Sequence, residues 1–475
     1  MADTAARTDL RELGSRRELF VDYDLIDHLD GAALKLHEPT PAEVAIRIDR
    51  PWEGPFNAGF CVIHHQGVYR LYYRALHGPE PFKLCYAEST DGVLWTKPNL
   101  GLVDSDGSTA NNILASDIAN FDLFLDTCPG VPDAERFKMA QYYVQGQRIT
   151  PYFAGEGGKE VYLLVSEDGL RFREASNEPI LRCDWPNAFD SQNVFFWSEA
   201  ERQYVCYFRF MDPLRTMARI TSPDLQTWSE PVAMTYGDTP REELYTNATQ
   251  PYFRAPHLYI ALPARFMPGR QVVTDEELAG MSMATVGKHV YHNDCSDGVF
   301  MTTRAGSTQY DRPFMETYVR PGLGSNHWIS RTNYPIHGLV QTGPEELSFY
   351  VTREYAQPTW HIRRYTLRVD GFSSVNAPYR GGELHTKPLT FTGNGLAINF
   401  RTGAAGGVRV ELQDREGRPL PGYSLTDCDE LIGDAINRVV TWNGSRDVAP
   451  LAGTPIRLRF VMRDADLYAL RFGDD

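Results

Sequence analysis

Three carboxylates stand beside strand-like runs, where they could do acid–base chemistry. Asp190 opens an apolar run directly after Phe189. Glu53 lies between Trp52 and a Gly-Pro turn, and Asp126 begins a turn at the end of another apolar run. Two carboxyl groups that flank one bond can protonate the leaving oxygen and attack or activate water. We therefore expect Asp190 as nucleophile or base, Glu53 as general acid, and Asp126 as a stabiliser that raises the pKa of the acid.

Each of these carboxylates also has a purely structural interpretation. Asp190 could cap the turn before its strand, Asp126 could belong to an Asx-turn, and Glu53 could lie in a solvated loop. Weaker candidates for the same chemistry are Asp22, Asp24, Glu242 and Glu243.

Amide, guanidinium and aromatic side chains accompany the three carboxylates. Amides and arginine hydrogen-bond to hydroxyl groups, and an indole presents a flat face to a sugar ring. The expected substrate-binding residues are Trp52, Asn57, Gln192, Asn193, Asn247, Gln250, Arg331 and Asn333.

A repeated turn organises the elements that must position these groups. Ser89-Thr-Asp-Gly-Val-Leu-Trp95 recurs at 166–172 and 222–228, and degraded copies follow at 303–310 and 368–371. In such a turn the Asp caps the backbone, the Gly takes a positive φ, and the aromatic packs on the next strand. Five copies along one chain indicate a repeat architecture.

Two or three strand-like runs precede each copy of the turn, which is the pattern of a propeller blade. We predict an all-β protein with a five-bladed β-propeller over 45–385. Helical periodicity is limited to 275–281. Residues 1–44 should close the ring through Glu18–Asp22. Residues 386–475 alternate apolar and polar side chains, which predicts a C-terminal β-sandwich.

The repeat, with its Asp-Gly-x-x-Trp turns and a C-terminal sandwich, resembles glycoside hydrolase family 32 and the related family 43. Local support comes from Gly59–Tyr73, which is similar to the first blade of that family, and from Phe189–Trp197, which resembles its Arg-Asp-Pro stretch. The resemblance implies the propeller fold and hydrolysis of furanosides, with the inner strands converging on one funnel.

The chain also departs from the family pattern. The Trp-x-Asn-Asp-Pro-Asn-Gly motif is replaced by Trp52–Gly59, and a Glu-Cys-Pro motif is missing. The Asp190 stretch falls in the third predicted blade, whereas the family has Arg-Asp-Pro in its second. The site residues are therefore chosen by expected geometry and not by family motif.

The resulting expectation is a glycoside hydrolase that cleaves fructofuranosyl or arabinofuranosyl bonds in a small carbohydrate substrate. One alternative is a phosphorylase or transglycosylase on the same fold, for which Arg209, Arg265 and Arg331 could bind phosphate. A second is a carbohydrate-binding propeller without catalysis, since a fold does not fix a function. A third, a protein scaffold, is disfavoured by the amide-rich funnel. The sugar, the linkage, the stereochemical outcome and the oligomeric state stay open.

The charge and the amino-acid composition of the chain indicate which classes of binding partner are disfavoured. The formal net charge is −15, which disfavours nucleic acid and membrane surfaces as partners. No secretory signal or membrane-length apolar run is visible, and the seven cysteines show no Cys-x-x-Cys spacing, so we expect a cytoplasmic protein. No cofactor is required by this chemistry and no metal site is expected. Asp104 and Asp106 would suit a structural calcium ion, although they lack the full loop pattern.

Overall fold

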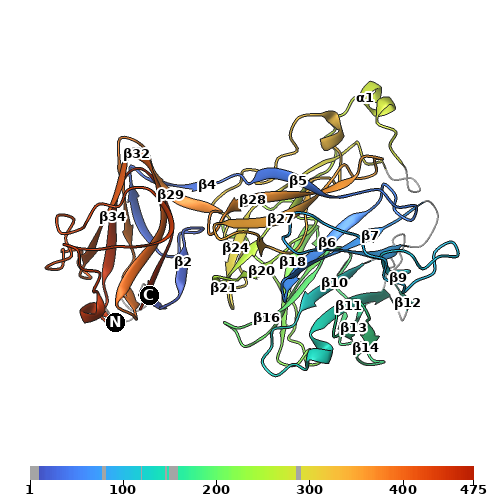
Figure 1. Ribbon diagram of the computed structural model, residues 1–475, viewed down its shortest axis with the longest axis horizontal. Coiled ribbons are helices and arrows are strands. Elements are labelled where there is room, and N and C mark those ends of the chain that lie inside the picture. The colour runs from blue at the N-terminus through green and yellow to red at the C-terminus, as the bar shows by residue number, and fades with distance from the viewer. Residues whose placement is uncertain are drawn as a thin grey trace. The chain divides into compact units, whose positions relative to one another are not determined.

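The computed structural model describes residues 10–77, 82–118, 120–144, 147–148, 159–284 and 290–474. They divide into two compact units. The larger consists of Pro39–Tyr252 and Pro256–Thr366, and the smaller of Met1–Glu38, Phe253–Ala255 and Leu367–Asp475. Nearly all regular structure is β-strand. A short helix, α1 (Asp275–Gly280), lies in an insertion of the larger unit (Figure 1).

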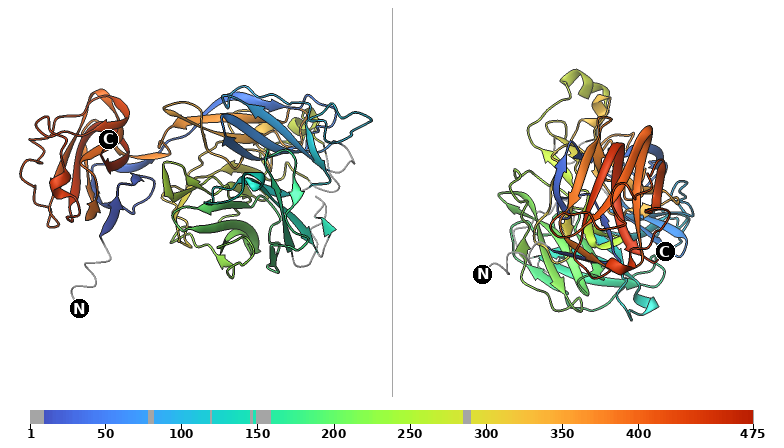
Figure 2. Two further views of the ribbon diagram at one scale, coloured as in Figure 1. Left: turned by 60° about the horizontal axis from the view of Figure 1, so that its bottom comes forward. Right: turned by 90° about the vertical axis from the view of Figure 1, so that its left-hand side faces the viewer.

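The larger unit is a five-bladed β-propeller, which confirms the predicted fold class. Its blades follow one another around the ring in chain order (Figures 1 and 2). Blade one contains β6 (Ala58–His65), β7 (Val68–Ala75), β8 (Lys83–Ser89) and β9 (Ile113–Ser116). Blade two contains β10 (Phe121–Leu125), β11 (Phe137–Val144), β12 (Gln147–Arg148), β13 (Lys159–Ser166), β14 (Arg173–Glu174) and β15 (Leu181–Cys183). Blade three contains β16 (Val194–Ser198), β17 (Gln203–Asp212), β18 (Leu214–Ser222) and β19 (Val232–Ala233).

The fourth and fifth blades are less regular than the first three. Blade four contains β20 (Gln250–Tyr252), β21 (Ala255–Ala261) and β24 (Met301–Arg304), with a separate pair β22 (Ala264–Met267) and β23 (Cys295–Gly298). Blade five contains β25 (Tyr334–Pro335), β26 (Val340–Gln341), β27 (Glu346–Arg353) and β28 (His361–Arg368). The outermost strand of blade five is β5 (Thr40–Arg47), which pairs antiparallel with β28. A strand from the start of the chain therefore closes the ring beside the last blade.

The repeated turns have the predicted local structure. Asp91 accepts hydrogen bonds from the backbone N–H groups of Val93 and Leu94, and Gly92 has a φ of 73°. The Tyr350 hydroxyl of blade five donates to the Gly92 carbonyl of blade one at 2.5 Å. In the same way the Tyr72 hydroxyl of blade one donates to the Gly169 carbonyl of blade two at 3.0 Å. The turns thus join neighbouring blades as well as strands.

The smaller unit contains the predicted C-terminal β-sandwich. Its strands are β1 (Arg11–Gly14), β2 (Arg17–Leu19), β3 (Ile26–Asp30), β4 (Ala33–Leu36), β29 (Ser373–Ala377), β30 (Gly382–Thr386), β31 (Leu389–Phe391), β32 (Gly395–Gln413), β33 (Asp434–Val439) and β34 (Arg457–Gly473). The long strand β34 pairs with β2, β29, β30 and β32. Leu458, Phe460 and Met462 alternate into its core, as the period-two pattern requires.

The N-terminal segment differs from the prediction. The run Glu18–Asp22 was expected to close the propeller, but Arg17–Leu19 pairs with β34 of the smaller unit, and Phe20 joins its core. Ring closure falls instead to β5, which begins at Thr40. A period-two pattern shows that a strand exists but does not identify the strand with which it pairs. The prediction that Glu18–Asp22 closes the propeller was wrong for this reason.

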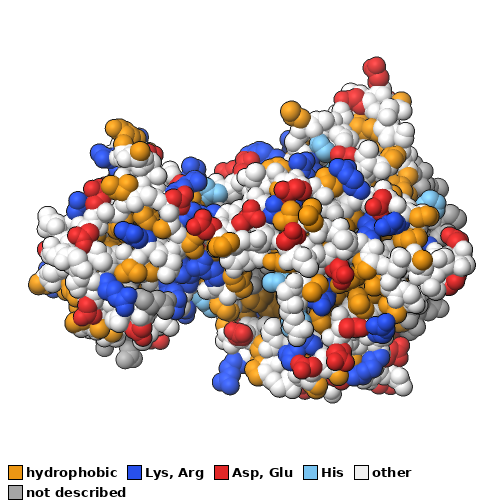
Figure 3. All heavy atoms as spheres, in the orientation of Figure 1, with side chains coloured by type: hydrophobic (Ala, Val, Ile, Leu, Met, Phe, Trp, Pro, Cys, Tyr) orange, Lys and Arg blue, Asp and Glu red, His pale blue; other side chains and the backbone are white. Residues whose placement is uncertain are grey.

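In the described part of the chain, no helix combines the length and the apolar character that a membrane crossing needs. The acidic and basic side chains of the propeller are interspersed on the face shown in Figure 3.

Candidate active site

The first residues of the inner strands gather at one end of the propeller axis, because each blade begins with its inner strand. Several of these residues have left-handed backbone conformations, which side chains other than glycine rarely adopt. Phe189, Ala248, Arg331 and Asn333 have φ values of 57°, 45°, 60° and 63°. Strained backbone is concentrated at functional sites in many proteins. We call this end of the axis the strand-start end.

Asp190 lies at the strand-start end, directly after Phe189. Its side chain is 40% exposed, and its Oδ2 accepts a hydrogen bond of 2.6 Å from Nη2 of Arg209. The same guanidinium donates to the carbonyl oxygens of Asp190 and Tyr245. Arg209 comes from β17 and is only 2% exposed. A buried guanidinium therefore fixes a carboxylate that solvent and ligands can reach.

Three guanidinium groups surround the half-buried ring of Tyr245. The Cζ atoms of Arg209, Arg215 and Arg331 lie 4.5, 5.1 and 5.9 Å from its centroid. We call these three residues the arginine cluster. Burial by itself would raise the pKa of Tyr245, but the positive charges of Arg331 and Arg209 outweigh it and hold the pKa below its usual value. The phenol is thus a stronger acid than a free tyrosine.

Glu53 does not lie where a general acid is needed. Both carboxylate oxygens bind Nζ of Lys97, at 2.7 and 2.8 Å. The Tyr73 hydroxyl and the backbone N–H groups of Asp49 and Arg50 complete its hydrogen bonds. The side chain is 0% exposed. These contacts make Glu53 a buried structural anion of blade one, and the assignment as acid is corrected.

Asp126 is likewise a structural anion. It follows the last residue of β10, whereas Asp190 precedes the first residue of β16. Neighbouring inner strands run in the same direction, so the two carboxylates lie toward opposite ends of the axis. Asp126 accepts hydrogen bonds from the Tyr204 hydroxyl and the Cys128 N–H, and its Oδ2 lies 2.8 Å from Nζ of Lys138. The predicted role beside the acid is therefore corrected.

The four predicted asparagines position backbone and do not face a ligand. All four are fully buried. Asn57 accepts hydrogen bonds from the N–H groups of Gly54 and Leu76, which hold the start of blade one. Asn193, Asn247 and Asn333 each donate to backbone carbonyls near the start of an inner strand, and their assignment as substrate ligands is corrected.

The remaining predicted ligands divide between structural contacts and the site. The Trp52 indole donates to Asn112 and packs in the core between blades one and five. The Gln250 side chain accepts from the Leu339 N–H. Gln192 donates to the Phe60 carbonyl, and its Oε1 is buried without a hydrogen-bond partner among the described residues. The structure therefore brings Asp190 and Arg331 to the cluster around Tyr245.

Tyr245 is not among the site residues predicted from the sequence, and Arg209 is predicted only as a possible phosphate ligand. A signal for Arg209 existed, because an arginine interrupts the otherwise apolar run Tyr204–Phe210 of β17. Tyr245 carries no comparable signal, since its neighbours come from blades three and five. Asp122, at the start of β10, is buried and accepts the Phe195 N–H at 2.8 Å. Burial raises the pKa of Asp122 well above its usual value, so this carboxyl belongs to the core.

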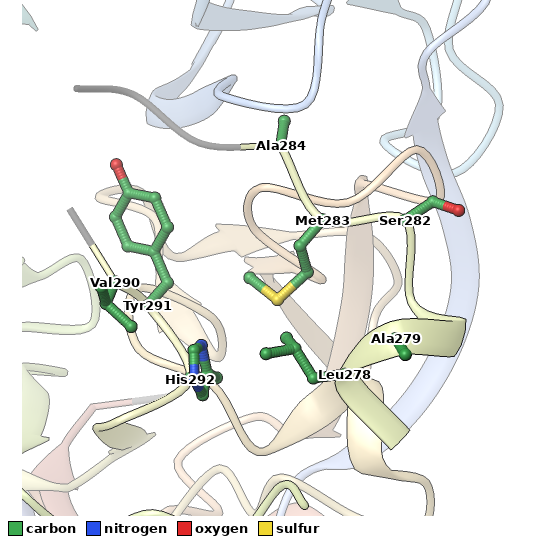
Figure 4. Close-up of a pocket in the computed structure, with 8 residues that line it drawn as sticks. All are labelled: Leu278, Ala279, Ser282, Met283, Ala284, Val290, Tyr291 and His292. Atoms are coloured by element: carbon green, nitrogen blue, oxygen red, sulfur yellow. The ribbon is translucent and has the colours of Figure 1, made fainter. Parts of the chain in front are cut away.

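A hollow adjoins this cluster through Tyr291, whose ring centroid lies 5.2 Å from Cζ of Arg331. This apolar hollow of about 330 Å³ lies between α1 and the segment 290–292 (Figure 4), lined by Leu278, Ala279, Ser282, Met283, Ala284, Val290, Tyr291 and His292. Among the described residues, no three His, Cys, Asp or Glu side chains gather as a metal site. Asp104, proposed for calcium, accepts the Gly107 N–H in an exposed turn.

Fold and site together define a five-bladed propeller with a polar strand-start end, followed by a β-sandwich. No protein-family model matches the sequence, and no curated protein matches it. Solved structures with similar folds include an N-acetylgalactosamine deacetylase from F. plautii, with 10% identity, a TM-score of 0.46, and coverage of 71% of this chain and 96% of that one.

Both glycoside hydrolase families named from the sequence are among the matched structures. A thermostable family-43 glycoside hydrolase has 12% identity and a TM-score of 0.40, with coverage of 69% of this chain and 95% of that one. A GH32 beta-fructofuranosidase from Bombyx mori has 10% identity and a TM-score of 0.38, with coverage of 93% and 94%.

Proposed function

We propose that the protein is a carbohydrate-active enzyme of the glycosidase type, with its active site at the strand-start end around Asp190. One observation carries the proposal: a part-exposed carboxylate is fixed by a buried arginine where the inner strands begin. The sequence resemblance favours furanosides, with fructofuranosyl and arabinofuranosyl glycosides as the first substrates to test.

Asp190 would act as base or nucleophile, because the hydrogen bond from Arg209 orients its carboxylate while the side chain stays 40% exposed. Tyr245 would be the acid, since the same guanidinium binds its backbone and the arginine cluster strengthens the phenol as a proton donor. In hydrolysis the bond from the anomeric carbon to the leaving oxygen breaks. The Tyr245 proton goes to that oxygen, water supplies hydroxide to carbon, and Asp190 takes the proton of the water.

A product screen tests this proposal. Wild type, Asp190→Asn and Tyr245→Phe would be incubated with fructans, arabinan, arabinogalactan and aryl furanosides. The matched control is Asp224→Asn, which makes the same change in an outer turn, where Asp224 caps Gln226 and Thr227. Loss of general acid–base catalysis removes about 10²- to 10⁴-fold in rate. Near-full activity of Asp190→Asn on a substrate that wild type cleaves would contradict the proposal.

A phosphorylase on the same fold is the second candidate, and the arginine cluster favours it. Such an enzyme would transfer the glycosyl group to inorganic phosphate in place of water. Sugar phosphate formed only in the presence of phosphate would identify this reaction, whereas free sugar at the same rate without phosphate would exclude it.

A further inference from the structure

Arg331 is a cation that tyrosine rings surround. Its Cζ lies 5.2 Å from the ring centroid of Tyr291, 5.8 Å from that of Tyr355 and 5.9 Å from that of Tyr245. Within the described ranges, no carboxylate lies at ion-pair distance from Arg331, and its guanidinium donates no hydrogen bond. The other two members of the arginine cluster are paired, Arg209 with Asp190 and Arg215 with Glu243. Arg331 is therefore the member of the arginine cluster whose positive charge is not neutralised by a carboxylate.

This arrangement is costly to stability. Cation–π contacts attract the guanidinium to the rings but leave its positive charge unneutralised. Arg331 also has a φ of 60°, a left-handed backbone conformation that is strained in a residue other than glycine. The chain has 62 Asp and Glu against 47 Lys and Arg, so carboxylates are not scarce. An unneutralised, strained arginine over the ring of Tyr245 is what an anionic ligand would require.

A further guanidinium lies in the same electrostatic environment. Arg74 packs over the ring of Phe82 at 4.1 Å, and burial, together with the charge of Arg331, lowers its pKa.

The half-buried rings beside Arg331 indicate what carries the anion. The centroids of Tyr245 and Tyr334 lie 5.3 Å apart, and the buried Tyr334 hydroxyl makes no hydrogen bond within the described residues. Aromatic faces suit a sugar ring, whereas a free inorganic anion would not use them.

We propose that the substrate is an acidic carbohydrate, whose carboxylate or other oxyanion substituent is bound by Arg331 while its ring lies against Tyr245 and Tyr334. This deepens the proposed function, on which it rests for the position of the reacting bond. In this proposal Asp190 acts at the glycosidic bond that is cleaved, and Arg331 selects a sugar that carries a negative charge.

Binding measurements test the proposal without any need for turnover. Isothermal titration calorimetry would compare uronic-acid-containing oligosaccharides with the same oligosaccharides after carboxyl reduction, and with inorganic phosphate alone. The proteins would be wild type, Arg331→Gln, Arg331→Lys and the control Arg171→Gln, which changes an exposed arginine in an outer turn of blade two. Thermal melts would verify that each variant is folded.

The expected result is that wild type binds an acidic form about tenfold to hundredfold more tightly than its reduced form, as for a hydrogen bond to a charged group. Arg331→Gln should lose this preference, Arg331→Lys should keep part of it, and Arg171→Gln should keep all of it. Equal affinity of wild type for acidic and reduced forms would overturn the proposal. Arg331-dependent binding of phosphate without preference for any acidic sugar would also overturn it, in favour of a free-phosphate site.

The two proposals fail separately. Arg331-dependent binding of an acidic sugar without any product would leave this inference standing and contradict the glycosidase. Asp190-dependent release of sugar from neutral furanosides, by a wild type that binds acidic and reduced oligosaccharides equally, would do the reverse.

Discussion

Glu53 and Asp190 are both carboxylates paired with a cation, yet their surroundings differ in every other respect. Glu53 is 0% exposed and receives hydrogen bonds from Lys97, Tyr73 and two backbone N–H groups. Asp190 is 40% exposed, and the described part of the chain gives its carboxylate one hydrogen bond, from Arg209. A carboxylate whose lone pairs are all used cannot take part in proton transfer without breaking the fold, whereas Asp190 has an oxygen left for a ligand.

The cations of the two regions differ in the same sense. Lys97 is consumed by Glu53 and Asp49, so blade one gains stability and no binding capacity from it. At the strand-start end, Arg331 has no carboxylate partner among the residues that the structure describes. A binding site can thus be distinguished from a structural ion pair because some of its charged groups still have capacity for a hydrogen bond or an ion pair with a ligand.

Removal of the Glu53 charge should produce the largest loss of stability. Glu53→Gln leaves Lys97 buried beside a neutral amide, and breaking a buried pair in this way costs about 3–5 kcal/mol. Urea unfolding should show that loss, and Asp190→Asn should lose less, because its carboxylate is 40% exposed and Arg209 keeps its hydrogen bonds to the carbonyls of Asp190 and Tyr245. The double variant Glu53→Gln with Lys97→Met should recover part of the loss. Equal stability of Glu53→Gln and wild type would remove the distinction between the two carboxylates.

His337 provides an intermediate effect that depends on pH. It is buried at the inner strands of blade five, and burial lowers its pKa to about 4. The unfolded chain takes up a proton near pH 6.5 and the folded chain does not, so stability is present above pH 6.5 and is lost as pH falls toward 4.

The difference in unfolding free energy between pH 7 and pH 5 should therefore be smaller in His337→Gln than in wild type, by about 2 kcal/mol. Urea unfolding at the two pH values measures it. Parallel pH dependence of the two proteins would show that His337 does not titrate as a buried group.

The outer turns should give the smallest effect. Asp91→Ala removes the acceptor for the N–H groups of Val93 and Leu94 in an exposed turn, and a loss of about 1 kcal/mol is expected. Substrate turnover should not change, because this turn lies at the outer edge of blade one. Thermal melts and the product assay together measure both quantities. A loss of turnover without a loss of stability would place the turn in the site.

The blades could be predicted from sequence because their signal is local. Ser89, Asp91 and Gly92 form one turn through contacts that span three residues, and the same contacts recur at Ser166 and Ser222. The fifth copy is instructive, since Arg368–Gly371 forms a turn that leads into β29 of the smaller unit and not into another blade strand. A local pattern predicts the turn but not the sheet that follows it.

The site could be predicted only in part, because its decisive contacts join distant residues. Asp190 was found through its place at the start of an inner strand. The roles of Glu53 and Asp126 depended on Lys97 and Lys138, whose pairing with them is tertiary. Tyr245 and Arg331 meet across two blades, and no spacing along the chain reports that contact.

The most direct test compares Asp190→Asn and Glu53→Gln on the substrate that the screen identifies, with activity expressed per folded molecule. We predict that Asp190→Asn loses at least about 100-fold in turnover per folded molecule and melts above the assay temperature. Glu53→Gln should melt at a lower temperature and retain the turnover of wild type. Turnover that survives in Asp190→Asn, or is lost in well-folded Glu53→Gln, would contradict the assignment of the active site.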